Sequence, residues 1–388
     1  MSADIVQPML GQANAVRRAR LVVTLLFGHF GICIGMWAAH IPVIQTRLGL
    51  DPAMLGLALL ASAFGTILAQ PLLGVLIART GARPATIVFP PLSALILAAV
   101  MASPTIVTLF IFCFCVGAAW GGMNVAINTM ASEIETLRGR PTMSSFHAGA
   151  SIGMLVGSAL GGLLVGAGLG NGMGAAGVAA LLFIASLLTI PHLLPSAPKE
   201  SGPAFMLPNR AVLGLGALAF LMFLVEGGMV DWSGVFLATD KGAEAGLAAA
   251  GFAAFTAAMA VCRVLGNGIV ERLGRKRVVA GGGVLIVIGV LTAVLSPWLP
   301  LCILGFVIIG IGASNIVPIL ISAAAQTPGM APSVAIGSVS TMLTAGFLVG
   351  PPLIGFVSHA TSLSLGLSLL TISGLAVAIA GFARSWPK

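Results

Sequence analysis

The chain has 388 residues, of which 58% are hydrophobic and only 7% are charged, and its mean hydropathy is +1.11. Soluble domains average about 45–50% apolar residues, so this composition excludes an ordinary soluble domain. The net charge of +8 would suit nucleic-acid binding, but the distribution of the basic residues argues against it. No stretch alternates as barrel strands do, which leaves an all-α polytopic membrane protein with about a dozen spanning helices.

The predicted elements fall into two similar series. A polar leader, 1–20, precedes a first six-helix bundle at 21–194, with helices at 21–45, 54–77, 85–102, 106–131 and 142–165 and a sixth ending near 191. A polar, proline-rich linker at 195–210 leads to a second bundle at 211–384. Its helices are expected at 211–238, 246–270, 278–296, 299–325, 333–358 and 362–383, before a short tail at 385–388.

The basic residues are unevenly shared between the two sides of these helices. Arg47 and Lys241 fall in loops on one side, and Arg263 lies inside a helix. By the positive-inside rule, the side that holds the rest is cytoplasmic, together with both termini. The residues on that side are Arg17, Arg18, Arg20, Arg79, Arg83, Arg138, Arg140, Lys199, Arg210, Arg272, Arg275, Lys276, Arg277, Arg384 and Lys388.

The two halves repeat each other at an offset of 193 residues. Gly117 aligns with Gly310, and the loop sequence around Arg79 aligns with the one around Arg272. The same offset holds across five helices without a gap. It predicts two pseudo-symmetric bundles related as parallel repeats.

The loops around Arg79 and Arg272 resemble a loop motif of a known family. In the first loop Gly74, Leu76, Arg79, Gly81 and Arg83 match the loop motif of the major facilitator superfamily, and 271–276 match it in the second. Within that superfamily, two asparagines in the fourth helix followed by Ser-Ser-Phe-His at 144–147 are similar to the MosC/YbjJ-like branch of bacterial inner-membrane proteins.

The resemblance implies a central cavity lined by helices one, four, seven and ten, with alternating access by rocking of the halves. It also implies cytoplasmic gates at the two motif loops. Ala78 stands where the family has Asp, so the first gate is expected to be weaker. Glu133 and Glu135 are expected to pair with Arg79 or Arg83. The gate residues are Gly74, Arg79, Gly81, Arg83, Glu133, Glu271, Arg272, Gly274, Arg275 and Lys276.

Polar and aromatic residues at helical spacing predict which side chains line the cavity. Helix one carries His29, Cys33, Trp37 and His40 at steps of four, four and three, which form one face, and helix four repeats the pattern. The alternative is that the histidines bond to neighbouring helices and the aromatic rings pack. The expected lining residues are His29, Trp37, His40, Trp120, Asn124, Asn128, Glu226 and Asn315.

Three charged residues fall inside predicted helices of the second half. An ionised side chain there must be paired, protonated or in contact with water. We expect Glu226 to be the proton-coupling carboxylate, with Asp231 and His29 as further candidates. Arg263 needs an acidic partner, either Glu226 or Asp231, and recognition of a substrate carboxylate is its second possible role. His147 is either a residue of the cytoplasmic mouth or a packed interface residue.

The expected function is secondary transport of a small polar organic solute, sugar-like or an amino-polyol, coupled to protons. Export of amphiphilic drugs or metabolites is one alternative, and a non-transporting sensor or scaffold on the same fold is another. No nucleotide-binding loop, nucleophile elbow or metal-binding histidine pair occurs in the sequence. We expect no enzyme activity, cofactor, metal or nucleic acid, and a monomer in the bacterial inner membrane whose partners are the solute, protons and lipid.

Overall fold

The computed structural model describes residues 3–138, 142–170, 172–195, 212–328 and 332–383. The expected tail at 385–388 and all of the expected linker except Pro195 lie outside these ranges. Within them the chain is helical apart from short turns. Twelve of these helical segments are long and apolar enough to cross a membrane, which confirms the predicted number and the all-α class.

The first bundle contains six spans. They are α1 (Ala3–Leu48), α2 (Pro52–Thr80), α3 (Ala82–Met101), α4 (Ile106–Arg138), α5 (Met143–Gly166) and α6 (Met173–Thr189), followed by the short η1 (Ile190–His192). The start of α2 shows why the helix begins there. Asp51 Oδ1 accepts a hydrogen bond from the Met54 backbone N–H at 2.8 Å, and Pro52 occupies the first helical position, where its missing N–H costs nothing.

The second bundle consists of α7 (Leu213–Thr239), α8 (Ala245–Ala248), α9 (Ala250–Val264), α10 (Gly266–Leu295), α11 (Leu299–Ala313), α12 (Ile316–Ala325), α13 (Pro332–Ala360) and α14 (Leu363–Ala383). Two spans that we expected to be continuous, 246–270 and 299–325, are interrupted. The eighth span breaks at Leu265, and the tenth breaks at Ser314 and Asn315. Helix α10 passes through the non-helical Gly274 and continues as the ninth span.

The predicted repeat is visible in the backbone. Gly49 and Gly242 have φ values of 64° and 63°, and the motif glycines Gly81 and Gly274 have 79° and 78°. Each pair is 193 residues apart, and each needs the left-handed region that glycine adopts without strain. The halves are therefore equivalent at the turns as well as in the helices.

In each bundle a basic side chain donates a hydrogen bond to a backbone carbonyl oxygen at an equivalent position. Arg47 Nη2 donates to the Met101 carbonyl oxygen at 2.7 Å, and Lys241 Nζ donates to the Val294 carbonyl oxygen at 3.2 Å. The two acceptors are again 193 residues apart. These contacts satisfy carbonyl groups at the ends of the third and ninth spans.

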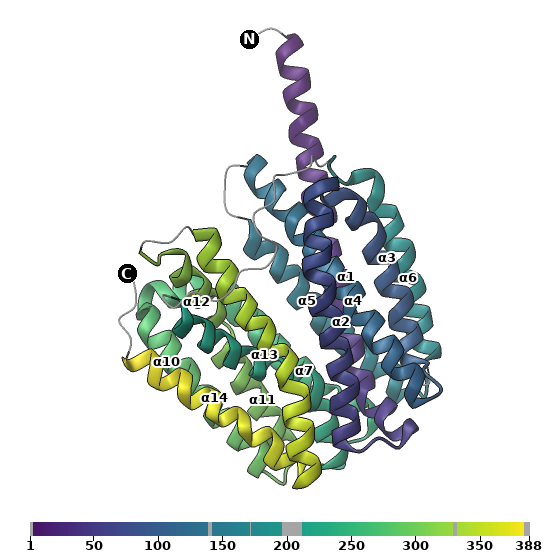
Figure 1. Cartoon of the computed structure of the whole chain (residues 1–388), viewed down its shortest axis with the longest axis vertical. Coiled ribbons are helices and arrows are strands. Elements are labelled where there is room, and N and C mark those ends of the chain that lie inside the picture. Colours follow the sequence, from purple (N-terminus) through teal and green to yellow (C-terminus); the bar gives the residue numbers. More distant parts are fainter. Residues whose placement is uncertain (1–2, 139–141, 171, 196–211, 329–331, 384–388) are drawn as a thin grey trace.

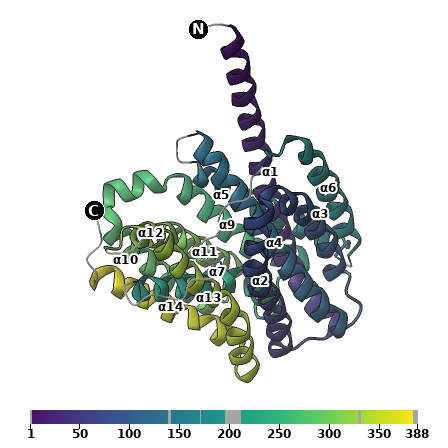
Figure 2. The same ribbon diagram turned by 45° about the horizontal axis from the view of Figure 1, so that its top comes forward.

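The bundles touch each other at one end. We call the end that carries the loops at Gly81 and Gly274 the basic end, and the other the opposite end. The backbones of the two bundles approach each other closely near the opposite end. A Cβ on Gly56 would lie 3.1 Å from the Pro351 oxygen, and a Cβ on Gly162 would lie 2.8 Å from the Gly246 oxygen. Small residues allow such approaches in membranes. Figure 1 shows the two groups of helices diverging from there, with α1 projecting beyond the basic end, and Figure 2 shows the same grouping in a second view.

Candidate functional site

An ion pair lies in the middle of the second bundle. Glu226 is at the centre of α7, about 20 Å from each helix end at 1.5 Å per residue. Its Oε1 lies 3.4 Å from Arg263 Nη2 on α9, and the two side chains are 20% and 26% exposed. Of the two acids that could have paired with this arginine, the structure selects Glu226. Partial exposure of both groups leaves the pair accessible at mid-membrane depth.

A break in the tenth span holds Arg263 in place. Pro318 has no N–H, so the carbonyl of Ser314, four residues earlier, lacks its usual helical donor. Arg263 Nε donates to that oxygen at 3.1 Å. A freed carbonyl at this depth needs another donor, because no lipid group can supply one. The proline therefore creates the acceptor that orients the guanidinium group.

Asn315 holds the neighbouring break together and is buried, with 8% of its surface exposed. Its Nδ2 donates to the Cys262 carbonyl at 3.1 Å and to Ser314 Oγ at 3.0 Å. A Cβ on Gly266 would collide with Asn315 Oδ1, so the glycine is needed where the two broken spans meet. Asn315 thus supports Arg263 and is not itself exposed as a lining residue in this conformation.

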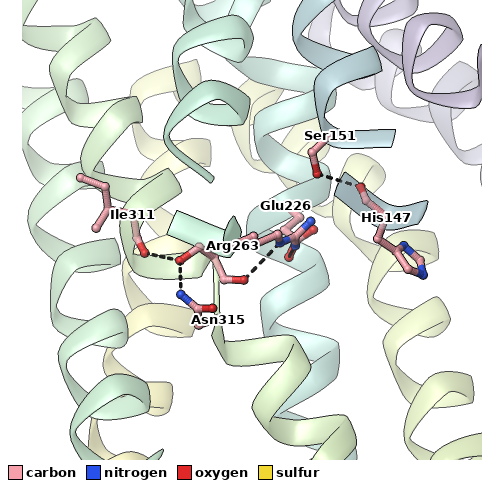
Figure 3. A network of polar contacts seen from close by, with 7 residues as sticks. His147, Ser151, Glu226, Arg263, Ile311 and Asn315 are labelled. Carbon is pink, nitrogen blue, oxygen red and sulfur yellow. Dashed lines mark hydrogen bonds and ion pairs between the residues drawn. The ribbon is translucent and has the colours of Figure 1, made fainter. Parts of the chain in front are cut away.

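The other bundle contributes His147 to this region. His147 is on α5, is exposed, and interacts electrostatically with Arg263. Its ring also packs edge-on against Phe27 of α1, with centroids 5.2 Å apart. Figure 3 shows His147 and Ser151 beside the Glu226–Arg263 pair. The arginine is therefore bordered by α7, by the broken tenth span and by α5.

Helix α4 presents the two predicted asparagines at partly buried positions. Asn128 Nδ2 donates to the Asn124 carbonyl at 2.8 Å, so one amide is partly used within the helix. Trp120, one turn earlier, is buried, and its indole N–H has no hydrogen-bond partner among the described residues. The asparagines remain candidates for polar contacts with a solute.

The predicted face of α1 is packed in this conformation. His29, Trp37 and His40 are 4%, 4% and 0% exposed. His29 Nε2 lies 3.1 Å from Ser93 Oγ on α3, and His40 Nδ1 lies 2.8 Å from the Met36 oxygen. These contacts match the alternative in which the histidines bond to their surroundings. The sequence does not reveal Ser93 as a partner, because nothing in the pattern of α3 aligns it with His29.

Asp231 is separate from the ion pair and only 4% exposed. It lies more than one turn after Glu226 on α7, and its carboxyl group has the Trp37 side chain as a hydrogen-bonding neighbour. Trp37 also packs edge-on against Trp120, with ring centroids 6.5 Å apart. Asp231 therefore belongs to the contact between the bundles.

The gate residues of the first motif lie at the basic end. Gly81 forms the turn between α2 and α3, Gly74 is half-buried one and a half turns before the end of α2, Arg79 is exposed, and Arg83 and Glu133 are partly buried. Glu135 is expected to pair with Arg79 or Arg83, and that pairing stays a prediction. Its Oε2 accepts from the Met143 backbone N–H at 2.7 Å and so caps the start of α5.

The second motif contacts its own bundle. Arg275 Nη1 donates to Gln326 Oε1 at 3.0 Å, and its Nη2 donates to Ser322 Oγ at 3.2 Å, both at the end of α12. Glu271, Arg272 and Lys276 are exposed. Gly274 makes the kink that separates the eighth span from the ninth.

The described residues include no group of three or more His, Cys, Asp or Glu side chains placed to hold a metal ion. The partly or fully exposed side chains of this region are the Glu226 carboxylate, the Arg263 guanidinium, the His147 imidazole and the amides of Asn124 and Asn128. Such groups can bind a charged or hydroxylated solute and can exchange a proton.

Comparison with known proteins gives a consistent result. The model of the Major Facilitator Superfamily matches residues 25–331 and 232–387. An MFS-type transporter of Yersinia pestis is 36% identical over 380 residues, covering 96% of this chain and 97% of the relative. The membrane protein MosC of Rhizobium meliloti is 30% identical over 382 residues, covering 96% and 92%. A variant of the nucleoside transporter NupG has the same fold, with a TM-score of 0.75 at 15% identity, covering 95% of this chain and 99% of that one.

Two repeated bundles with an accessible ion pair at mid-depth define an integral membrane protein of the transporter class. The chain belongs to the major facilitator superfamily. The expected resemblance to MosC is confirmed as well.

Proposed function

We propose that this protein is a secondary active transporter that moves a small polar organic solute across the bacterial inner membrane by alternating access, coupled to protons. The observation that carries the proposal is the ion pair of Glu226 and Arg263. A charged pair at mid-membrane depth is costly to maintain. Its partial exposure is what a solute and a proton would need in order to reach it.

Glu226 is the better candidate for the coupling carboxylate. Asp231, the other acid within α7, is packed between the bundles at 4% exposure, whereas Glu226 keeps a fifth of its side chain accessible. Protonation of Glu226 removes its attraction for Arg263. Proton binding is thereby linked to the availability of the guanidinium group.

The pattern of contacts between the bundles supports alternating access. Close approaches such as Gly162 to Gly246 occur next to the opposite end. Ser158 Oγ on α5 donates to the Ala249 carbonyl at 3.1 Å in the same region. A rocking motion that separates these surfaces would expose the site to the other side of the membrane.

The orientation follows from charge. The loops of the basic end carry Arg79, Arg83, Arg272 and Arg275, whereas Arg47 and Lys241 are at the opposite end. By the positive-inside rule the basic end is cytoplasmic, as are both termini. The conformation described here is then open towards the cytoplasm.

The proposal is tested by reconstituting the purified protein in vesicles. A thermal-shift screen of sugars, sugar acids, inositols, amino acids and cationic drugs first selects a solute. Flux of that solute is then measured with and without an imposed pH gradient. We expect accumulation only with the gradient. A drug-only response would favour the exporter, and the absence of any shift or flux across the panel would favour a sensor or scaffold.

A further inference from the structure

We propose that the solute of this site is an organic anion with a single carboxylate or a comparable group, and that Arg263 binds that group. This inference rests on the proposed transport function and specifies its substrate class. Glu226 is then the internal competitor of the solute, because it occupies the guanidinium group when the site is empty.

The hydrogen-bonding capacity of Arg263 supports this assignment. A guanidinium group offers five N–H donors in a planar fork that matches a carboxylate. Within the described part of the chain, Nε is used by Ser314 and one Nη2 donor by Glu226, while Nη1 makes no hydrogen bond. Because 26% of the side chain is exposed, an incoming oxygen atom can reach the unused donors.

The contact with Glu226 is weak enough to be exchanged. Charge-assisted hydrogen bonds usually measure about 2.7–2.9 Å, and the strongest arginine–carboxylate pairs are bidentate. The observed contact is a single one at 3.4 Å. Arg263 is held more closely by the Ser314 oxygen, at 3.1 Å. The guanidinium group can therefore keep its position when the carboxylate it binds is replaced.

The surrounding groups favour an anion over a cation. His147 of α5, from the other bundle, is an electrostatic neighbour of Arg263 and brings no negative charge to the site. Among the described residues, no other charged side chain contacts either member of the pair. A cationic solute would have to approach Arg263 and take a carboxylate that is already neutralised, whereas an anion meets the guanidinium group directly.

The test uses pairs of probes that differ in one group. Thermal shift and isothermal titration of the full-length protein are measured with glycerate and glycerol, gluconate and glucitol, and glucuronate and glucose. We expect at least one acid to stabilise and bind the wild-type protein, and its neutral counterpart to do neither. Loss of the charged fork in Arg263→Gln should weaken acid binding by about tenfold or more.

Matched variants separate binding from folding. Arg263→Gln leaves Glu226 without its partner, so the double variant Arg263→Gln/Glu226→Gln provides a neutral site that should fold and still fail to bind the acid. Glu226→Gln alone should bind the acid more tightly than the wild-type protein, by about threefold to tenfold, because the competitor is gone. Arg18→Gln removes an exposed positive charge far from the site and should change nothing.

Three results would overturn the inference. They are stabilisation by the neutral members of the pairs, equal acid binding by wild-type and the neutral double variant, and no binding of any of the three acids. The proposed function fails separately. Gradient-driven flux of a neutral solute in Arg263→Gln would support the transport function and contradict the binding of an organic anion. Acid binding without any flux would contradict the transport function and support the anion site at Arg263.

Discussion

Arg263 on α9 donates from Nε to the backbone oxygen of Ser314, 3.1 Å away in the tenth span. The oxygen is available because Pro318, four residues later, cannot donate to it. Two helices of the second bundle are thus joined through a backbone group that a regular helix would have used itself. The position of Arg263 therefore depends on Pro318, a residue that is not itself part of the ion pair.

Replacing this proline should disturb the site from a distance. In Pro318→Ala the new N–H can bond to the Ser314 oxygen and compete with Arg263. We expect a weaker hold on the arginine, a KM for the solute raised by about threefold to tenfold, and a melting temperature that is unchanged or higher because the helix is continuous. The KM is obtained from the flux measured at varied solute concentration.

Pro71→Ala is the matched control for this variant. It also removes a proline from a helix interior, but in α2 of the first bundle. An unchanged KM in Pro318→Ala, or an equal rise in both variants, would contradict the positioning role of the freed carbonyl.

Glu226→Gln should separate proton coupling from solute movement. The amide cannot exchange a proton, so accumulation driven by an imposed pH gradient should be lost, while exchange of labelled for unlabelled solute at equal concentrations should continue. Both are measured in vesicles. Glu244→Gln, which alters an exposed acid in the loop before α8, should retain both activities. Undiminished gradient-driven accumulation in Glu226→Gln would reject the coupling assignment.

The glycines at the opposite end should control the conformation. A Cβ on Gly162 of α5 would lie 2.8 Å from the Gly246 oxygen, so Gly162→Val should force the bundles apart there. Gly177→Val on α6 has no atom within 4 Å of its Cβ and provides the control. We expect Gly162→Val to lower transport by about tenfold or more, since sub-contact distances cannot be accommodated by backbone atoms.

The conformational effect has its own measurement. Spin labels at Leu169 and Glu244, exposed positions in loops of the two bundles at the opposite end, report their separation by pulsed EPR in a protein without native cysteines. The distance should lengthen in Gly162→Val and stay the same in Gly177→Val. Full transport activity with an unchanged distance in Gly162→Val would show that this contact is not needed.

The two motif loops should differ in importance. Glu271 is the acid of the second motif, and the equivalent residue in the first is Ala78, 193 positions earlier. Glu271→Ala removes a charge that the second loop possesses, and we expect it to reduce the rate of transport more than Ala78→Asp changes it. Flux measurements on both variants at equal protein content compare them. Equal or reversed effects would mean that the loops do not differ in this way.

Periodicity and repetition made most of the fold predictable. Helix number follows from apolar length, because each span needs about 20 apolar residues, and the offset of 193 correctly relates Gly81 to Gly274. The two broken spans were not predicted as breaks. Pro318 accounts for the break in the tenth span, but Leu265 is an ordinary helix former, and its break depends on the packing of Gly266 against Asn315.

The sequence by itself determined the class of protein, the number of spans, the repeat and the need of Arg263 for an acid, because all of these follow from hydropathy, spacing and the cost of a charge in lipid. Only the tertiary structure decided which acid Arg263 meets, which carbonyl orients it, and that His29 bonds to Ser93. Helical spacing shows which residues share a face. It does not show which neighbouring helix that face meets, and that choice depends on how the helices of the two bundles pack.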